Sequence, residues 1–122
     1  MSELSAEDRK LVTLARATRA RVGAAEGAAV RDTDGRTYAA ATVDLPSLQV
    51  SALGVCVAMA VASGSQGLEA AVLLGEAEAV AEGDLAALRE FGGDDVVVHL
   101  GDARGTVGTT LSAGGPAGDT SR

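Results

Sequence analysis

The sequence predicts a three-layer α/β sandwich built on a mixed sheet of about five strands. Helical and strand-type apolar patterns follow one another along the chain in the order helix, hairpin, helix, strand, helix, two strands. The chain has 122 residues, 47% of them apolar and 22% charged, which suits one globular domain and is too little for two. We therefore expect a folded domain over residues 1–111 and a flexible tail over residues 112–122, where no apolar period remains.

The first half of the chain supplies a helix, a hairpin and a second helix. Ser5 is a typical N-cap with acids in the turn that follows, so a helix begins there and runs to Arg19 or Arg21. Its inward positions are Leu11, Leu14, Ala15 and Thr18. Asp34-Gly35 predicts a turn between strands at 28–30 and 37–43. Residues 49–62 predict a helix that is covered on all sides, because they form no polar stripe.

The second half predicts a strand, a helix and a strand pair. Residues 70–74 are a continuous apolar run, typical of a strand buried on both faces. Residues 82–91 have helical periodicity and end at Gly92-Gly93. The inward positions of this helix are Leu85, Leu88 and Phe91. Residues 96–100 are the clearest strand, and residues 106–111 pair back onto it after a turn.

Scarce residue types limit the chemistry of this chain. It has one Cys, one His, no Trp, one Tyr and one Phe. A single Cys excludes an internal disulfide framework, and the polar segment 1–10 does not resemble a signal peptide, so we expect a cytoplasmic protein. The longest uncharged stretch, 45–67, contains Pro, Gln, Ser and Gly, which favours a buried helix over a membrane span.

The net charge of −7 is unevenly distributed. Residues 1–22 hold five basic and three acidic side chains, a balance of +2 that leaves −9 for the rest. An acidic body with few aromatic side chains is unsuited to nucleic acid, which we do not expect as a partner. The basic face of the first helix is typical of a solvated surface, with docking of a partner as the alternative.

Two blocks of sequence resemble the small zinc-dependent cytidine deaminases. Residues 27–36, Gly-Ala-Ala-Val-Arg-Asp-Thr-Asp-Gly-Arg, are similar to the family's first hairpin. Residues 81–93, Ala-Glu-Gly-Asp-Leu-Ala-Ala-Leu-Arg-Glu-Phe-Gly-Gly, are similar to its Cys-Gly-x-Cys-Arg-Gln-x-Leu-x-Glu-Phe segment. The resemblance covers about residues 4–111 and implies the family's fold and a homo-oligomer, a tetramer or a dimer.

The same resemblance implies that the catalytic groups are missing. In the family, three thiolate or imidazole ligands hold zinc, and a Glu moves protons to and from the base. The ligand and the Glu of the family's Cys-Ala-Glu string match Leu53 and Val55, and the two ligands of Pro-Cys-x-x-Cys match Ala81 and Asp84. Aliphatic side chains neither bind a metal nor carry a proton, so the resemblance implies no zinc.

Neighbouring polar positions have changed as well. The family's Arg residues beside the ligands match Cys56 and Leu85. Since such an Arg offsets thiolate charge, its loss together with the thiolates is what conversion of the site to apolar core would produce. The Asn-x-Glu that holds the ribose in the family matches Thr42 and Asp44, whose side chains are able to form hydrogen bonds but have a shorter reach.

The sequence therefore predicts a non-catalytic cytidine-deaminase-like protein, without zinc or another cofactor, that acts as a binding or scaffolding subunit. A protein partner and a nucleoside ligand are both open. One alternative is a working cytidine deaminase with unrecognised ligands. A displaced metal site at Cys56, Asp84 and His99 is another, although a lone Cys on an apolar helix is usually a buried hydrophobe. We expect His99 to be a hydrogen-bonded residue on the face opposite Val98.

Overall fold

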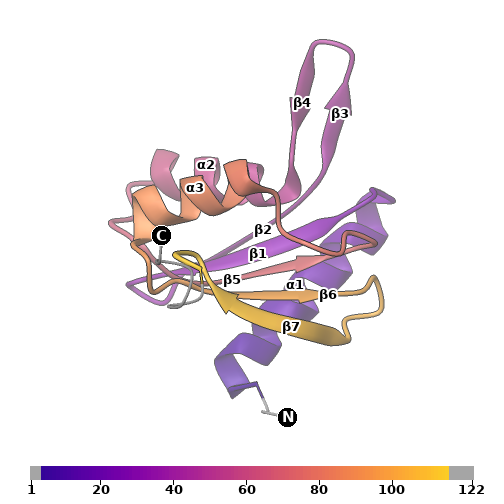
Figure 1. Ribbon diagram of the computed structural model, residues 1–122. Coiled ribbons are helices and arrows are strands. Elements are labelled where there is room, and N and C mark those ends of the chain that lie inside the picture. The colour runs from indigo at the N-terminus through magenta and orange to yellow at the C-terminus, as the bar shows by residue number, and fades with distance from the viewer. Residues whose placement is uncertain (1–3, 116–122) are drawn as a thin grey trace.

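A five-stranded mixed sheet forms the centre of the computed structural model, which describes residues 4–115 (Figure 1). Its strand order is β2-β1-β5-β6-β7. Only β5 and β6 run parallel, and the other neighbours are antiparallel. The bounds of the five strands are β1 Gly27–Asp32, β2 Thr37–Ala41, β5 Leu68–Leu74, β6 Val97–Gly101 and β7 Val107–Ser112. The predicted mixed sheet is confirmed.

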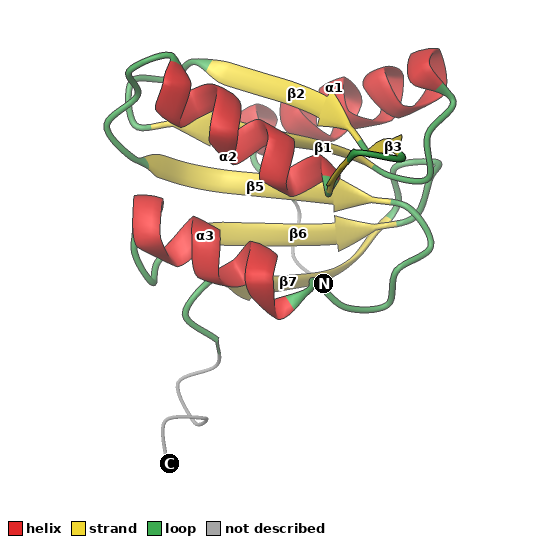
Figure 2. Cartoon of the chain, turned by 90° about the horizontal axis from the view of Figure 1, so that it is seen from above, coloured by secondary structure: helices red, strands yellow, loops and turns green. Residues whose placement is uncertain are grey.

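Helices cover both faces of this sheet, which makes the predicted three layers. The helix α1 (Ala6–Val22) lies on one face, and α2 (Ala52–Ala62) and α3 (Glu82–Gly92) lie on the other (Figure 2). Each face buries its own apolar cluster, the larger one beneath α2 and α3. No helix within residues 4–115 is both long and apolar enough to cross a membrane.

Helix α1 begins where its sequence predicts. The hydroxyl of Ser5 accepts the backbone N–H of Asp8 at 3.0 Å, and the helix ends at Gly23, whose φ of +76° favours glycine. Leu11, Ala15 and Thr18 are buried, four and three residues apart along one stripe. Leu14 is 37% exposed, so its predicted inward position is wrong. At about 100° of helix rotation per residue, Leu14 lies about 40° beyond Thr18, at the edge of that stripe and partly open to solvent.

The segment between β2 and α2 departs most from prediction. The strand expected over 37–43 ends at Ala41, and the helix expected from Gln49 begins at Ala52. Between them β3 (Val43–Leu45) pairs with β4 (Leu48–Val50) around Pro46-Ser47, and this hairpin projects from the body in Figure 1. A short apolar run does not by itself distinguish strand from helix.

The predicted coverage of α2 on all sides is also wrong for a single chain. Leu53, Cys56 and Ala60 are fully buried, but Val61 on the outer side is 51% exposed. The apolar helix therefore has one side packed on the sheet and one side that this chain leaves open.

The remaining elements lie within about two residues of their predicted positions. In α3, Leu88 is fully buried, while Leu85 and Phe91 are partly buried against the same cluster. Strand β7 runs to Ser112, and Ala113 is fully buried, so the first residues of the predicted tail belong to the folded part. Residues 116–122 of that tail lie outside the described residues.

Candidate site at the N-termini of α2 and α3

A hydrogen bond joins the N-termini of α2 and α3. Ser51, the N-cap of α2, accepts the backbone N–H of Gly54 at 2.9 Å and donates its hydroxyl to Asp84 Oδ1 at 2.7 Å. Asp84 lies in the first turn of α3, where the helix dipole favours a carboxylate. The two helix ends that the resemblance associates with chemistry are therefore adjacent, and one hydroxyl–carboxylate pair connects them.

The four residues that the resemblance places at this site differ in exposure and chemistry. Leu53 is fully buried in the core, and Val55 is partly buried against it. Ala81 is the exposed N-cap of α3 and makes no side-chain capping bond. Asp84 is half-buried and bonded to Ser51. Of the four, only Asp84 has a side chain that can ligate a metal or carry a proton.

A second carboxyl lies near Asp84. Burial raises the pKa of Glu26, and the negative charge of Asp84 raises it further. Gly75 makes room for this side chain, since a Cβ there would lie 2.9 Å from Glu26 Cγ. Sequence reasoning missed Glu26, because nothing in its local pattern shows that its charge interacts with that of Asp84.

The two ribose-position residues have different surroundings. Thr42 Oγ1 accepts the backbone N–H of Glu26 at 3.1 Å and donates to its carbonyl at 3.3 Å, which ties the chain after β2 to the start of β1. Asp44 is exposed on β3, in the projecting hairpin. The Thr42 side chain is thus hydrogen-bonded to the backbone of Glu26, whereas the Asp44 side chain is accessible to solvent.

Most of the densely linked charged groups lie on the opposite face of the sheet. His99 is 4% exposed, with Nε2 2.8 Å from Asp8 Oδ2 and Nδ1 2.9 Å from Thr110 Oγ1. Arg31 binds Asp8 at 2.9 Å and Glu69 at 3.1 Å. The prediction of a hydrogen-bonded His99 opposite Val98 is confirmed, and its partners come from α1 and β7.

This network stabilises the negative charge of the Asp8 carboxylate. Burial by itself would raise this pKa, but the hydrogen bonds from His99 and Arg31, together with their charge, hold it below its usual value. The network therefore anchors the first turn of α1 to four strands of the sheet, β1, β5, β6 and β7.

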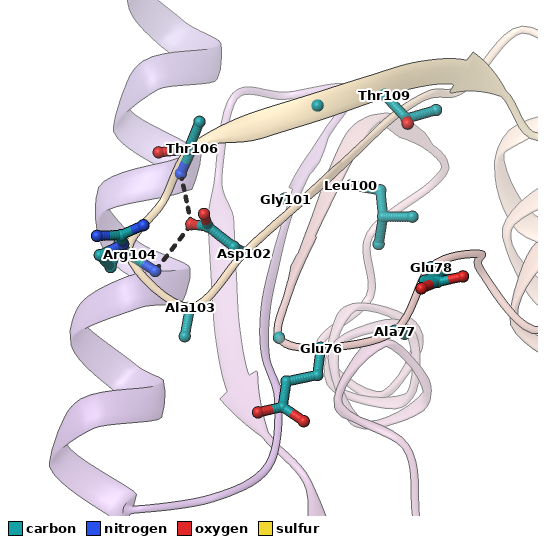
Figure 3. Close-up of a pocket in the computed structure, with 12 residues that line it drawn as sticks. Glu76, Ala77, Glu78, Leu100, Gly101, Asp102, Ala103, Arg104, Thr106 and Thr109 are labelled. Carbon is teal, nitrogen blue, oxygen red and sulfur yellow. Dashed lines mark hydrogen bonds between the residues drawn. The ribbon is translucent and has the colours of Figure 1, made fainter.

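A cavity of about 680 Å³ opens at the carboxyl ends of β5 and β6 (Figure 3). Asp102 accepts the backbone N–H groups of Thr106 and Arg104 at 3.0 Å each, and these bonds lower its pKa. Glu76 and Glu78 point away from one another in Figure 3. The cavity has the size of a small-molecule pocket, but its acidic groups do not converge on one point.

Comparison with models of known protein families shows to which family this chain belongs. The family model described as "Cytidine deaminase-like" matches residues 4–105. This chain belongs to the cytidine deaminase-like family. Comparison with curated protein sequences finds no match.

Solved structures of cytidine deaminases share this fold. The cytidine deaminase of Burkholderia pseudomallei is 24% identical with a TM-score of 0.78, over 91% of this chain and 94% of that one. The enzyme of Mycobacterium leprae is 18% identical with a TM-score of 0.72, over 97% and 100%. The enzyme of Mycobacterium tuberculosis is 23% identical with a TM-score of 0.67, over 77% and 85%. At these identities the likeness shows the fold alone, and it confirms the predicted cytidine-deaminase-like architecture.

The residues of this family member do not fit the zinc ion that its relatives' chemistry implies. Zinc in proteins is held by three or four Cys, His, Asp or Glu ligands at about 2.0–2.3 Å. Within residues 4–115, no three such side chains gather closely enough to hold a metal. At the helix ends, Ser51 engages Asp84, and the Leu53 and Ala81 side chains offer no donor.

The displaced site is not assembled either. Cys56 lies on the buried side of α2, with its thiol 3.6 Å from the Tyr38 carbonyl oxygen. Burial raises the pKa of this thiol to about 12, which keeps it protonated. His99 faces α1 on the other side of the sheet, and Asp84 binds Ser51. These three residues have separate partners in separate places, so the structure does not bring them together.

Proposed function

We propose that this cytidine-deaminase-like chain holds no zinc, catalyses no deamination and works as a binding or scaffolding subunit. The observation that carries the proposal is the complete burial of Leu53 in the first turn of α2, where the resemblance expects a metal ligand. A fully buried leucine side chain contributes to core packing and excludes water from the position it fills.

The remaining polar groups support this function because they satisfy one another. Hydrolytic deamination requires an activated water and a group that shuttles protons. Ser51 and Asp84 are bonded to each other, and Thr42 is bonded to the backbone of Glu26. Glu26 can hold a proton, but no ligand set beside it would activate a water.

Incubation with cytidine tests the absence of catalysis. We expect no change in the ultraviolet absorbance of cytidine over hours, with zinc chloride added or omitted. Steady conversion to uridine that scales with protein concentration would overturn the proposal and establish the alternative, a deaminase with unrecognised ligands.

A nucleoside ligand without chemistry is tested separately by thermal unfolding. A ligand that binds only the folded state raises the melting temperature by mass action. A higher melting temperature with cytidine or uridine would identify a nucleoside-binding subunit. If no nucleoside of a panel raises the melting temperature, the proposed subunit binds a protein partner instead. A cytoplasmic location remains a prediction.

Self-association is part of the proposal, and the open side of α2 supports it. Val61 is 51% exposed, and Leu45 and Leu48 on the hairpin are 55% and 53% exposed. An isolated two-stranded hairpin is marginally stable in water, so contact with another chain would stabilise it. We expect light scattering to show a dimer or tetramer of the 12.0 kDa chain. Val61→Asp should dissociate it and Val22→Asp on α1 should not, whereas a wild-type monomer would contradict self-association.

A further inference from the structure

Helix α1 carries five basic side chains, spread over about 200° of its circumference on the side away from the sheet, that form no salt bridge within residues 4–115. Arg31 and Arg89, elsewhere in the molecule, form salt bridges with Asp8 or Glu69 and with Glu82. No basic side chain of α1 forms one with any residue in the range 4–115. We call these five side chains the basic face of α1: Arg9, Lys10, Arg16, Arg19 and Arg21.

A sixth cation from another element extends this face. The β6–β7 turn rests on α1, since a Cβ on Gly105 would lie 3.3 Å from Val12 Cγ1 and 3.5 Å from Arg16 Cδ. The exposed Arg104 precedes Gly105 and lies beside α1 in Figure 3. Arg104 therefore adds a cation from a second element beside Arg16, on the flank of the helix that also carries Arg9 and Arg19.

The first two turns of the helix also form a shallow depression. Arg9, Lys10 and Thr13 border it, with Ala6 and the 37% exposed Leu14. This combination of charged rim and exposed leucine matches the composition of small protein docking sites, in which an apolar contact is surrounded by polar groups.

We propose that the basic face of α1 docks an acidic segment of a partner protein. This inference rests on the proposed function as a binding subunit and names the chemistry of its partner. Four of the five cations on the helix are Arg, whose planar guanidinium binds carboxylates with two parallel hydrogen bonds. Residues 1–22 carry +2 in a chain of net −7, so an acidic partner is attracted to this helix and repelled by the rest of the surface.

Membranes and nucleic acids fit this surface less well. The apolar stripe of α1, formed by Leu11 and Ala15, is fully buried against the sheet, so this stripe is not available to insert into lipid. Among residues 6–22 there is no aromatic side chain on which a base could stack. A long polyanion would also approach the acidic remainder of the molecule.

Fluorescence anisotropy with a labelled deca-glutamate peptide tests the proposal. We expect binding by the full chain at 50 mM NaCl that weakens strongly at 300 mM, because exposed ion pairs are screened by salt. Arg16→Gln should weaken binding about two- to fivefold, and the triple variant Arg9→Gln/Lys10→Gln/Arg16→Gln about tenfold or more, consistent with exposed ion pairs of about 0.2–1 kcal/mol each. The matched control is Arg36→Gln, an exposed Arg on the β1–β2 hairpin, which should leave binding unchanged.

Two results would overturn this assignment. Absence of peptide binding, or equal binding by the wild type and the triple variant, would show that the basic face is only solvated. Equal or tighter binding of a ten-nucleotide oligothymidylate, or of vesicles containing phosphatidylserine, would show that the face prefers another polyanion. Cytidine turnover would refute the proposed function while leaving the peptide measurement independent, so the two failures are distinguishable.

Discussion

The two faces of the sheet contain two different kinds of polar site. At the N-termini of α2 and α3, where the family resemblance places chemistry, Leu53 is fully buried and Ser51 and Asp84 form a hydroxyl–carboxylate pair. On the α1 face, Asp8 and His99 belong to a network that joins a helix and several strands. The N-termini of α2 and α3, where the resemblance places chemistry, hold few hydrogen-bond donors. The donors of the network on the α1 face are bonded to partners within that network.

Two carboxyl groups, Glu26 near the helix ends and Asp8 on the α1 face, show the same contrast. The pKa of Glu26 is raised by burial and by the nearby charge of Asp84, whereas His99 and Arg31 hold the pKa of Asp8 below its usual value. The charge of Asp8 is therefore compensated by its partners on the α1 face, whereas Glu26 has no partner within residues 4–115 that lowers its pKa.

The largest expected effect comes from truncating the apolar side chain at the helix ends. Leu53→Ala should lower the free energy of unfolding by about 2–5 kcal/mol, because it leaves a cavity in the core. Leu14→Ala on α1, which is 37% exposed, should cost less than about 1 kcal/mol. Urea unfolding measures both. A neutral Leu53→Ala would mean that this position is a solvent-accessible site and would remove the contrast between the two faces.

Breaking the network on the α1 face should have the next largest effect. Asp8→Ala leaves Arg31 and His99 without their shared partner and should cost about 1–3 kcal/mol. Glu7→Ala, in the same helical turn but exposed, is the matched control and should be nearly silent. Equal small losses in both variants, measured by denaturant unfolding, would show that the network contributes little.

The single polar link at the helix ends should matter less. Ser51→Ala removes the N-cap of α2 and the donor to Asp84, and we expect a loss of about 0.5–2 kcal/mol. Ser47→Ala, on the exposed hairpin turn, controls for loss of a hydroxyl. If both variants unfold at the wild-type midpoint, the link between α2 and α3 is incidental.

The smallest expected effect concerns how the free energy of unfolding depends on pH through Glu26 and Asp8. Because the pKa of folded Glu26 is raised from 4.5, its ionisation opposes folding above that pKa, so Glu26→Gln should stabilise the protein by about a few tenths of a kcal/mol at pH 7. This gain should vanish as the pH falls below 4.5. Asp8 has the opposite sign, since its contribution is complete above 3.8 and is lost as the pH falls through its lower folded-state pKa.

Unfolding free energies at several pH values check these signs, with Asp44→Asn as an exposed control on β3. A Glu26→Gln variant that is less stable than the wild type at pH 7 would show that Glu26 has a favourable ionic partner near the helix ends.

The sequence predicted the order of elements and the three layers, because helical spacing, turn residues and the family resemblance all agree over most of the chain. It failed at 43–50, where an apolar run around Pro46-Ser47 forms a hairpin instead of the start of a helix. The error has a physical cause: α2 and β4 are both apolar, and only pairing across the turn separates them.

The site could be predicted only in part. A resemblance aligned Leu53 and Asp84 with catalytic positions, but local pattern could not show that Ser51 bonds Asp84 or that the charge of Asp84 acts on Glu26. These contacts join residues distant in sequence, as does the bond from Asp8 to His99. Partners of that kind follow from the fold and not from periodicity.

Metal content tests the central claim most directly. Protein purified without chelator, and analysed by inductively coupled plasma mass spectrometry, should contain no stoichiometric zinc, because Leu53 and Ala81 supply no ligand and Asp84 is bonded to Ser51. One zinc ion per chain, retained through dialysis, would contradict the account.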